Sequence, residues 1–237
     1  MKSEHIQPNN FLLSIVVPVF NEHAVVTKAI DAILKTPYNK EVIIVDDGST
    51  DGTRNIILKI QHPEARVFLH EKNEGKGRAI QTAFEHIRGD IVIIQDADLE
   101  YDPAEYPLLL EPILSGTADV VYGSRFAATK SLHLPHFSFY IGNRFLTVLS
   151  NLFSGLNLTD METCYKIFTR GALKGITINE NRFGIEPEIT AKIAKKKLKI
   201  CEVPISYHCR SRKEGKKIKW SDGLWAVWCI MRYNIFE

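Results

Sequence analysis

Short apolar runs alternate with stretches that carry apolar residues at helical spacing through the first half of the chain. Four runs, LLSIVVPVF (12–20), EVIIV (41–45), ARVFLH (65–70) and DIVII (90–94), each lead into such a stretch, and ADVVYGSR (118–125) closes the series. In segment 25–33, for example, apolar residues recur every three or four positions. This alternation predicts parallel βαβ units, and strands that are apolar throughout predict a mostly parallel α/β sheet with helices on both faces.

The pattern loosens after about residue 125, where we expect helices near 138–153 and 186–196 and a strand near 198–206. No flexible linker interrupts the chain, so we predict one domain over residues 1–237. The last segment, SDGLWAVWCIMRYNIFE (221–237), predicts a helix capped by Ser221 or Asp222 that is apolar around most of its circumference. Such a helix either packs on the domain or lies in a membrane interface or against a membrane partner protein.

Polar residues follow each predicted strand. They are Asn21 and Glu22, Asp46 and Asp47, the turn 73–77, Asp96 and Asp98, and the segment 123–125. In an open α/β sheet, ligands bind in the crevice beyond the carboxyl ends of the strands. The sequence therefore predicts that five turns converge on one ligand-binding edge.

The carboxylates of Asp96 and Asp98 stand two residues apart, so in an extended chain they share a face. Two hard oxygen ligands without a neighbouring His or Cys favour Mg²⁺ or Mn²⁺, and Glu100 is a third candidate ligand. In the alternative interpretation, one aspartate caps the following helix and the other is solvated. The buried strand before them and the nearby pair Asp46 and Asp47 favour the metal site.

Two further turns suggest a nucleotide. At the end of the second strand, Asp46 or Asp47 can accept hydrogen bonds from a nucleobase or ribose, whereas residues 49–53 form a turn and helix cap. The segment NEGKGRA (73–79) resembles a phosphate-cradling loop, in which glycines allow close approach and Lys76 supplies charge at a helix N-terminus. It lacks the full G-x-G-x-x-G pattern and follows the third strand, which argues against a dinucleotide-binding dehydrogenase.

Composition narrows the classes of function and the compartments that the sequence allows. The formal net charge is +2, and no recognition helix or interleaving of aromatic and basic residues is evident, so we expect no nucleic-acid partner. The four cysteines show no C-x-x-C spacing and the N-terminus does not resemble a secretory signal, which favours the cytoplasm. The longest apolar run, LWAVWCIM (224–231), is shorter than the about 20 residues that span a bilayer.

The ordered set IVVPVFNE, VDDGSTDGT, NEGKGRA, DADLEYDP and GSR resembles glycosyltransferase family 2 enzymes with the GT-A fold. The segments GNRFLT, TDMETCYK, FGIEPEITAKIA and EVPISYHCRSRKEGKKI resemble the branch of dolichyl- and polyprenyl-phosphate mannosyl- and glucosyltransferases. The resemblance covers nearly the whole chain. It implies a Rossmann-like sheet with a nucleotide-sugar half over about 11–125 and an acceptor half over about 126–237.

The resemblance also implies roles for individual residues. The residues implied to bind the nucleotide-sugar donor are Pro18, Phe20, Glu22, Asp46, Asp47, Lys76, Asp96, Ala97 and Asp98. Asp96 and Asp98 would hold the metal on the diphosphate; many relatives have Gln in place of Glu100, which leaves its role open. Arg125 and Arg144 would bind the acceptor phosphate, with a surface ion pair as the alternative. Asp160 and Glu162 would orient the sugar or the acceptor, or cap a loop.

A basic loop completes the implied site. Its cations Arg210, Arg212, Lys216 and Lys217 would close as a lid on the donor diphosphate, with solvated surface as the alternative.

Three functions remain open from the sequence. The first is a metal-dependent inverting transfer of a sugar from a GDP-mannose or UDP-glucose type donor to a polyprenyl or dolichyl phosphate, with peripheral binding to the cytoplasmic face of a membrane. This acceptor is already ionised and needs no base. The second has a saccharide hydroxyl as acceptor, which would require a carboxylate base from Asp160 or Glu162. The third is binding of a nucleotide sugar without turnover.

Overall fold

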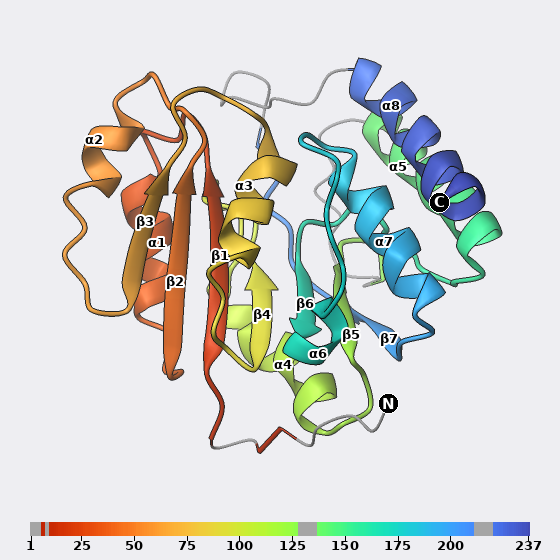
Figure 1. The fold of residues 1–237 in the computed structure, drawn as a ribbon, viewed down its shortest axis with the longest axis horizontal. Helices are drawn as coiled ribbons and strands as arrows, with labels where there is room; N and C mark the ends of the chain where they lie inside the picture. The colour runs from red at the N-terminus through yellow and green to blue at the C-terminus, as the bar shows by residue number, and fades with distance from the viewer. Residues whose placement is uncertain (1–5, 8–9, 128–136, 211–219) are drawn as a thin grey trace.

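A seven-stranded sheet runs through the computed structural model, which describes residues 6–7, 10–127, 137–210 and 220–237 (Figure 1). Its strands are β1 (Leu13–Val19), β2 (Lys40–Asp46), β3 (Ala65–Leu69), β4 (Ile91–Ile94), β5 (Val120–Ser124), β6 (Lys166–Thr169) and β7 (Ile200–Pro204). They lie in the order β3-β2-β1-β4-β6-β5-β7, and only β6 runs antiparallel to its neighbours. The predicted mostly parallel sheet is confirmed.

Helices cover both faces of this sheet. One face is packed by α1 (Val26–Leu34), α2 (Thr53–Ile57), and η1 (Pro103–Glu105) with α4 (Tyr106–Leu114). The other is packed by α3 (Lys76–Phe84), α6 (Arg170–Leu173) and α7 (Ile185–Lys195). Beside α7 lie α5 (Phe137–Ser154), α8 (Trp220–Met231) and the terminal turn η3 (Arg232–Phe236), with α8 against both α5 and α7 (Figure 1).

Alternation along each central strand divides its side chains between two cores. Ile15 and Val17 of β1 pack with α1 and α4, whereas Val16 between them packs with α3. In β2, Ile44 joins the first core and Ile43 the second. Because both faces are covered, these strands need apolar residues at every position, which is the pattern that the sequence shows.

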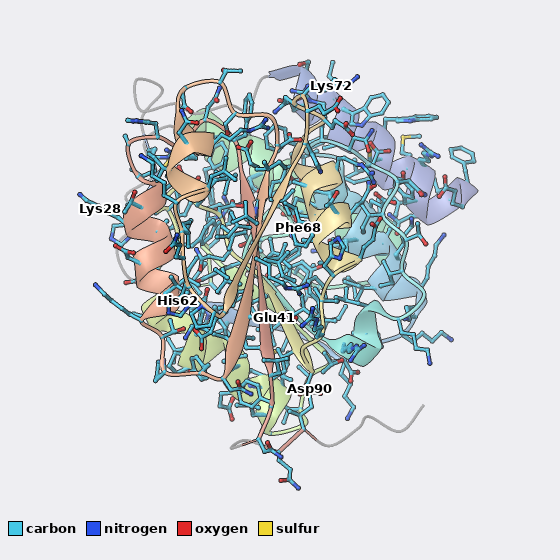
Figure 2. All side chains as sticks on the ribbon, turned by 60° about the vertical axis from the view of Figure 1, so that its left-hand side comes forward. Lys28, Glu41, His62, Phe68, Lys72 and Asp90 are labelled. Atoms are coloured by element: carbon cyan, nitrogen blue, oxygen red, sulfur yellow. The ribbon has the colours of Figure 1, made fainter. Side chains whose placement is uncertain are left out.

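The two ends of the sheet differ in chemistry. Glu41 and Asp90 lie at the end where β2 and β4 begin, and Lys72 lies at the opposite end, beyond β3 (Figure 2). Glu41 accepts hydrogen bonds from Ser14 and Arg66, and Asp90 accepts one from the backbone of Leu12. These pairs close the amino end of the sheet, so the carboxyl end is the one available for a ligand.

Two local predictions were incomplete. The sequence did not predict β6 or α6, because KIFT of β6 is neither alternating nor apolar throughout and α6 is a single helical turn. The helix α8 begins at Trp220, so Ser221 and Asp222 lie in its first turn rather than at its cap. Among the described residues, no helix is both long and apolar enough to cross a membrane.

Candidate active site

The carboxyl ends of β1, β2, β4 and β5 meet at one edge of the sheet, as the sequence predicted. They place Glu22, Asp47, Asp96 and Arg125 there. Because β6 runs in the opposite direction between β4 and β5, the loop that precedes it, residues 159–165, arrives at the same edge. The reversed strand therefore adds a second group of polar residues to the site.

An acidic cluster stands beyond β1 and β4. Arg210 joins its members: Nη1 lies 2.8 Å from Glu22 Oε2, Nη2 lies 3.2 Å from Asp98 Oδ2, and Nε lies 3.9 Å from Glu100 Oε1. Tyr207 Oη also donates to Glu100 Oε2 at 2.7 Å. Arg210 is thus the cation that balances three carboxylates from two separate loops.

Asp96 faces a different partner. Its Oδ1 lies 2.8 Å from Lys76 Nζ at the start of α3, and Lys76 Nζ lies 3.8 Å from Glu186 Oε1 at the start of α7. Glu186 also accepts a hydrogen bond from the buried Lys166 of β6. A chain of alternating charges, Asp96–Lys76–Glu186–Lys166, therefore links the end of β4 to the second half of the molecule.

The crowded carboxylates at this edge of the sheet favour binding of a cation. Burial, and then the charges of Asp96 and Glu100, raise the pKa of Asp98 to about 7, although Arg210 opposes the shift. In the described part of the chain, no three acidic, His or Cys side chains are arranged as a metal cage. The donor set still fits Mg²⁺ or Mn²⁺, because these ions need only one or two carboxylates beside substrate phosphates.

The aspartates after β2 are held by the protein itself. Asp46 is fully buried, with Arg54 Nε 2.7 Å from its Oδ2. Asp47 accepts hydrogen bonds from the backbone N–H groups of Glu74 and Gly75, at 2.9 and 2.7 Å, and its Oδ1 lies 2.8 Å from His70 Nδ1. Asp47 is therefore bonded to the 73–77 turn, and Asp46 is paired with Arg54. The predicted contacts of both aspartates with a nucleotide stay predictions.

The remaining predicted donor residues lie close by. Pro18 and Phe20 are half-buried at the end of β1, and Ala97 is buried between the two aspartates. Arg212 and Lys217 lie outside the described residues, as does Lys216, so Arg210 is the only cation of the predicted lid whose position the structure gives.

The glycines of the NEGKGRA turn are needed for packing within the protein. Close approach of a phosphate, which we predicted for them, stays a prediction. A Cβ atom on Gly75 or Gly77 would overlap the backbone of Asn181 or Glu180. Gly75 also has a φ of 106°, which disfavours any other residue. These glycines therefore allow close packing against the chain before α7, whereas Lys76 lies at the helix start as expected.

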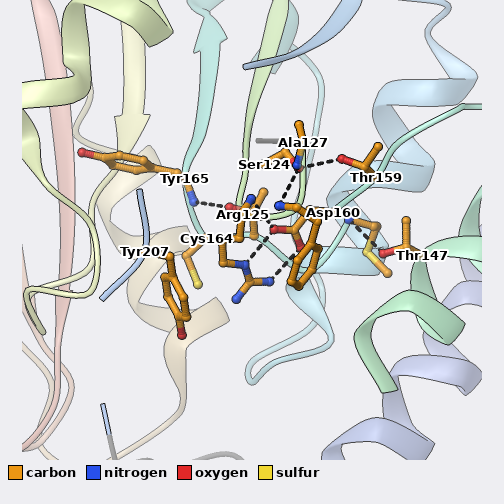
Figure 3. A network of polar contacts seen from close by, with 12 residues as sticks. Ser124, Arg125, Ala127, Thr147, Thr159, Asp160, Cys164, Tyr165 and Tyr207 are labelled. Carbon is orange, nitrogen blue, oxygen red and sulfur yellow. Dashed lines mark hydrogen bonds and ion pairs between the residues drawn. The ribbon is translucent and has the colours of Figure 1, made fainter. Parts of the chain in front are cut away.

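Arg125 and Asp160 form a buried ion pair at the end of β5 (Figure 3). Arg125 Nε and Nη2 donate to Asp160 Oδ2 and Oδ1 at 2.7 and 2.8 Å, and the backbone N–H of Arg125 adds a third bond. Arg144 of α5 donates to the carbonyl of Thr159 at 3.2 Å. The two arginines, 19 positions apart in sequence, therefore converge on adjacent residues of one loop.

This loop is fixed from several sides. The backbone N–H groups of Thr159 and Asp160 donate to the carboxylate of Glu202 on β7, and Met161 N–H donates to Thr147 Oγ1 of α5 at 3.1 Å (Figure 3). Lys166 Nζ donates to the carbonyls of Met161 and Thr163. Glu162 lies between these anchors, with its Oε1 buried and without a hydrogen-bond partner among the described residues.

Several residues that support the site were not predicted from the sequence. Lys166 and Glu202 hold the 159–165 loop, and Tyr207 contacts Glu100. A signal was present for Glu202, because a carboxylate inside the apolar run ICEVP needs a partner. The ion pairs of Lys166 and Glu186 had no such signal, since they join segments that only the fold brings together.

Comparison with known proteins finds relatives over most of the chain. A family model described as Glycosyl transferase family 2 matches residues 14–177. Low-salt glycan biosynthesis hexosyltransferase Agl6 of Haloferax volcanii is 30% identical over 84% of this chain; the match spans about half of that protein, 48%. Dolichyl-phosphate beta-glucosyltransferase ALG5A of Trichomonas vaginalis is 30% identical over 97% of this chain and 75% of that protein.

Solved structures share the fold. Glucosyl-3-phosphoglycerate synthase from Mycobacterium tuberculosis, in complex with Mn²⁺, UDP and phosphoglyceric acid, has a TM-score of 0.74 at 20% identity, over 96% of this chain and 80% of that one. Mannosyl-3-phosphoglycerate synthase from Rubrobacter xylanophilus has a TM-score of 0.67 at 19% identity, over 94% and 72%. The predicted GT-A fold is confirmed.

Proposed function

Because the chain belongs to glycosyl transferase family 2, we propose that it transfers a hexose from a nucleotide sugar to the phosphate of a polyprenyl or dolichyl phosphate. The observation that carries this proposal is the convergence of Arg125 and Arg144 on residues 159–160, on the same sheet edge as the acidic cluster. A donor diphosphate with its metal suits the acidic cluster, and an anionic acceptor suits the two arginines. Dolichyl-phosphate glucosyltransferases among the relatives support this acceptor class.

The donor would lie beyond β1, β2 and β4. Asp96 and Asp98, with Glu100 as the third candidate, would hold Mg²⁺ or Mn²⁺, replacing contacts now made by Lys76 and Arg210. When bound, the metal neutralises charge that develops on the departing nucleoside diphosphate. Mn²⁺ accompanies UDP in the mycobacterial structure of the same fold, so Mn²⁺ is the first ion to test.

The acceptor would be held in line by cations rather than deprotonated. The ion pair with Asp160 uses Nε and Nη2 of Arg125, so a phosphate that leaves this pair intact would bind through Nη1. Arg144, half-buried on α5, would provide the second contact. Direct displacement from the opposite side of the sugar would invert its anomeric centre, and positioning of the acceptor in line would contribute to the rate.

A saccharide hydroxyl as acceptor is the second candidate, and it requires a base. Asp160 does not suit that task, because both of its oxygens accept hydrogen bonds from Arg125. Of the two carboxylates that the sequence offers, only Glu162 would then be available. The phosphate acceptor is preferred because it uses the arginines without requiring a base.

A lipid acceptor requires access to a membrane, and we propose that α5 and α8 provide it. Exposed apolar residues gather on these two packed helices and on η3. They are Ile141, Phe145, Val148, Leu152, Phe153, Leu224, Trp225, Trp228, Ile235 and Phe236. We call this set the apolar face. Arg144 lies on the same helix as half of it, so membrane binding at α5 would bring the acceptor phosphate to the site.

One screen tests the proposed function. The protein is incubated with GDP-mannose, UDP-glucose or UDP-N-acetylglucosamine and Mn²⁺, with and without a polyprenyl phosphate, and nucleoside diphosphate release is followed. We expect one donor to give release that depends on the lipid phosphate and stops when the metal is chelated. Release that the lipid phosphate does not stimulate with any donor would contradict the proposal.

A further inference from the structure

The carboxyl group of Glu162 lies near two ion pairs without joining either of them. It interacts electrostatically with the charges of Glu186, Lys166, Arg125 and Asp160. Lys166 and Glu186 are bonded to each other, and so are Arg125 and Asp160. The side chain is partly buried, and its Oε1 is fully buried with no hydrogen-bond partner among the described residues.

The backbone around Glu162 is held on both sides. Lys166 Nζ donates to the carbonyls of Met161 and Thr163, the two residues that flank it. Met161 is also packed in the core against α5. Because the loop is fixed, the unpartnered oxygen is not the result of a loose segment. A buried carboxyl oxygen without a partner is less unfavourable when the group is neutral, and because the side chain is only partly buried, the rest of it is open to a ligand.

The surroundings of Glu162 favour the protonated acid. Burial, and then the charge of Glu186, raise the pKa of Glu162 to about 8, while Lys166 and Arg125 oppose the shift and Asp160 adds to it. At neutral pH the carboxyl group therefore carries a proton most of the time. A neutral acid can donate a hydrogen bond to an anion, whereas a carboxylate would repel it.

We propose that Glu162 binds the acceptor, by donating a hydrogen bond from its carboxylic O–H to an oxygen of the phosphate group that Arg125 and Arg144 hold. This inference rests on the proposed function, because it requires a phosphate acceptor. It assigns Glu162 a task opposite to that of a base: the proton stays on the carboxyl group, and no proton is transferred during the reaction. The second negative charge of the acceptor phosphate would raise the pKa of Glu162 further and so keep the proton on its carboxyl group.

Acceptor binding through Glu162 would depend on pH in a distinctive way. The second ionisation of a phosphate monoester has a pKa of about 6, so the charge of the acceptor is constant from pH 7.5 upward. Over the same range Glu162 loses its proton, and its hydrogen bond to the phosphate is replaced by repulsion. Affinity for a phosphate acceptor should therefore fall as the pH rises, for a reason that lies in the protein.

The test measures binding rather than turnover. Affinity of the full chain for farnesyl phosphate, a short polyprenyl phosphate, is measured by calorimetry at pH 7.5 and 9.5, in Mn²⁺ and the nucleoside diphosphate of the active donor. We expect the wild-type protein to lose at least about tenfold in affinity across this range. Glu162→Gln, whose amide donates at both pH values, should bind equally at both. Glu162→Ala should bind at least about tenfold more weakly at pH 7.5.

A matched control is available in Glu105. Its Oε2 is also buried without a partner among the described residues, but its Oε1 accepts a hydrogen bond from the backbone N–H of Ser206, and Glu105 is not among the charges that shift the pKa of Glu162. Glu105→Gln should keep the wild-type dependence on pH. Nucleoside diphosphate affinity and the circular dichroism spectrum of every variant are recorded to show that folding and the donor site are intact.

The outcomes separate the two proposals. If the wild-type protein does not bind farnesyl phosphate, the proposed acceptor class is wrong, and the assignment of Glu162 is wrong with it. If the wild-type protein binds, but Glu162→Gln keeps the wild-type pH dependence or Glu162→Ala binds as tightly as wild type, only the assignment of Glu162 is overturned. If both Glu162 variants bind normally yet lose turnover, Glu162 acts as a base.

Discussion

Two carboxylates of the candidate site, Asp98 and Asp160, lie in opposite electrostatic surroundings. Asp160 receives three hydrogen bonds from Arg125 in a buried ion pair. Asp98 shares Arg210 with Glu22 and Glu100, and burial together with the charges of Asp96 and Glu100 raises its pKa to about 7. One carboxylate is therefore satisfied by the protein, and the other is suited to a cation that arrives with the substrate. Substitutions at the two positions should have different consequences.

Replacing Asp98 by Asn should remove activity without weakening the fold. The variant loses an anionic metal ligand, and we expect turnover to fall by at least about a hundredfold, comparable to the loss of a strong electrostatic contact in the transition state. Because the change relieves crowding among three carboxylates, the melting temperature should not fall. Asp102→Asn is the matched control, since exposed Asp102 only caps η1, with Oδ1 2.9 Å from Ala104 N. Full activity of the Asp98 variant at saturating Mn²⁺ would contradict the metal assignment.

Arg144 offers the cleaner test of the acceptor site. Arg125→Ala would leave Asp160 buried without its partner, at a cost of about 3–5 kcal/mol of stability. Arg144→Ala removes a half-buried arginine that donates to the backbone carbonyl of Thr159. We expect the KM for polyprenyl phosphate to rise about tenfold or more, with nucleoside diphosphate affinity unchanged.

The control for this variant is Arg170→Ala. Arg170 also donates to a backbone carbonyl, that of Arg88, at 3.2 Å, but it lies at the amino end of β4, away from the site. The control should leave both constants unchanged. An equal loss of nucleoside diphosphate affinity in Arg144→Ala would move this arginine to the donor side.

Glu162 should also affect the pH dependence of stability. Between the ordinary carboxyl pKa of about 4.3 and its folded value of about 8, the folded protein holds a proton that the unfolded chain releases. The free energy of unfolding should therefore fall as the pH rises through this window. Glu162→Gln should reduce that decline, of which the raised pKa of Asp98 leaves a share, and denaturant unfolding at pH 5 and pH 8 would measure the change. Exposed Glu111→Gln is the control, and an unchanged decline in Glu162→Gln would show that Glu162 is ionised at neutral pH.

One side of the helix α8 packs in the core, and its other side is part of the apolar face. Ala226, Cys229 and Ile230 are buried, whereas Leu224 and Trp228 are exposed. The two alternatives left open by the sequence are therefore not exclusive for this helix: it packs on the domain, and its outer side is free for a membrane. Deleting the helix would expose the core around α7, so substitutions on the outer side are the better test.

The apolar face should bind anionic membranes through α5. Ile141, Phe145, Val148 and Leu152 recur every three or four residues and so form one stripe along the helix. Leu152→Glu places a charge where the side chain is 75% exposed, and we expect weaker co-sedimentation with liposomes and unchanged nucleotide binding. Leu108→Glu on α4, at a residue 56% exposed, is the control and should bind liposomes normally. Equal binding by both variants would exclude this face as the contact.

Regular elements were predictable where the sequence shows a helical period or a continuous apolar run. The central strands β1, β2 and β4 and the helices α1, α3 and α7 lie where the apolar pattern places them. The strand β6 was not predicted, because four residues with Lys166 at their start show neither alternation nor a continuous apolar run. This omission matters for function, since β6 brings the 159–165 loop to the site.

At the scale of the whole molecule, sheet order decides which residues meet. Placing β6 between β4 and β5 sets the acidic cluster and the Arg125–Asp160 pair on the same edge. Asp96, Asp98 and Arg125 could be proposed from sequence because each follows a strand. The pair Arg210–Glu22 could not, because its members are 188 positions apart and only the fold joins them. The division into a nucleotide-sugar half and an acceptor half stays a prediction.

The proposed function requires that the sugar is transferred to a phosphate oxygen. This bond is seen directly by ³¹P NMR of the purified lipid product, formed from the active donor, Mn²⁺ and polyprenyl phosphate. We expect the phosphomonoester signal of the acceptor to be replaced by that of a phosphodiester, and the ¹H spectrum of the product to show an anomeric configuration opposite to that of the donor. A product in which the phosphomonoester persists and the sugar is attached to a hydroxyl group would contradict it.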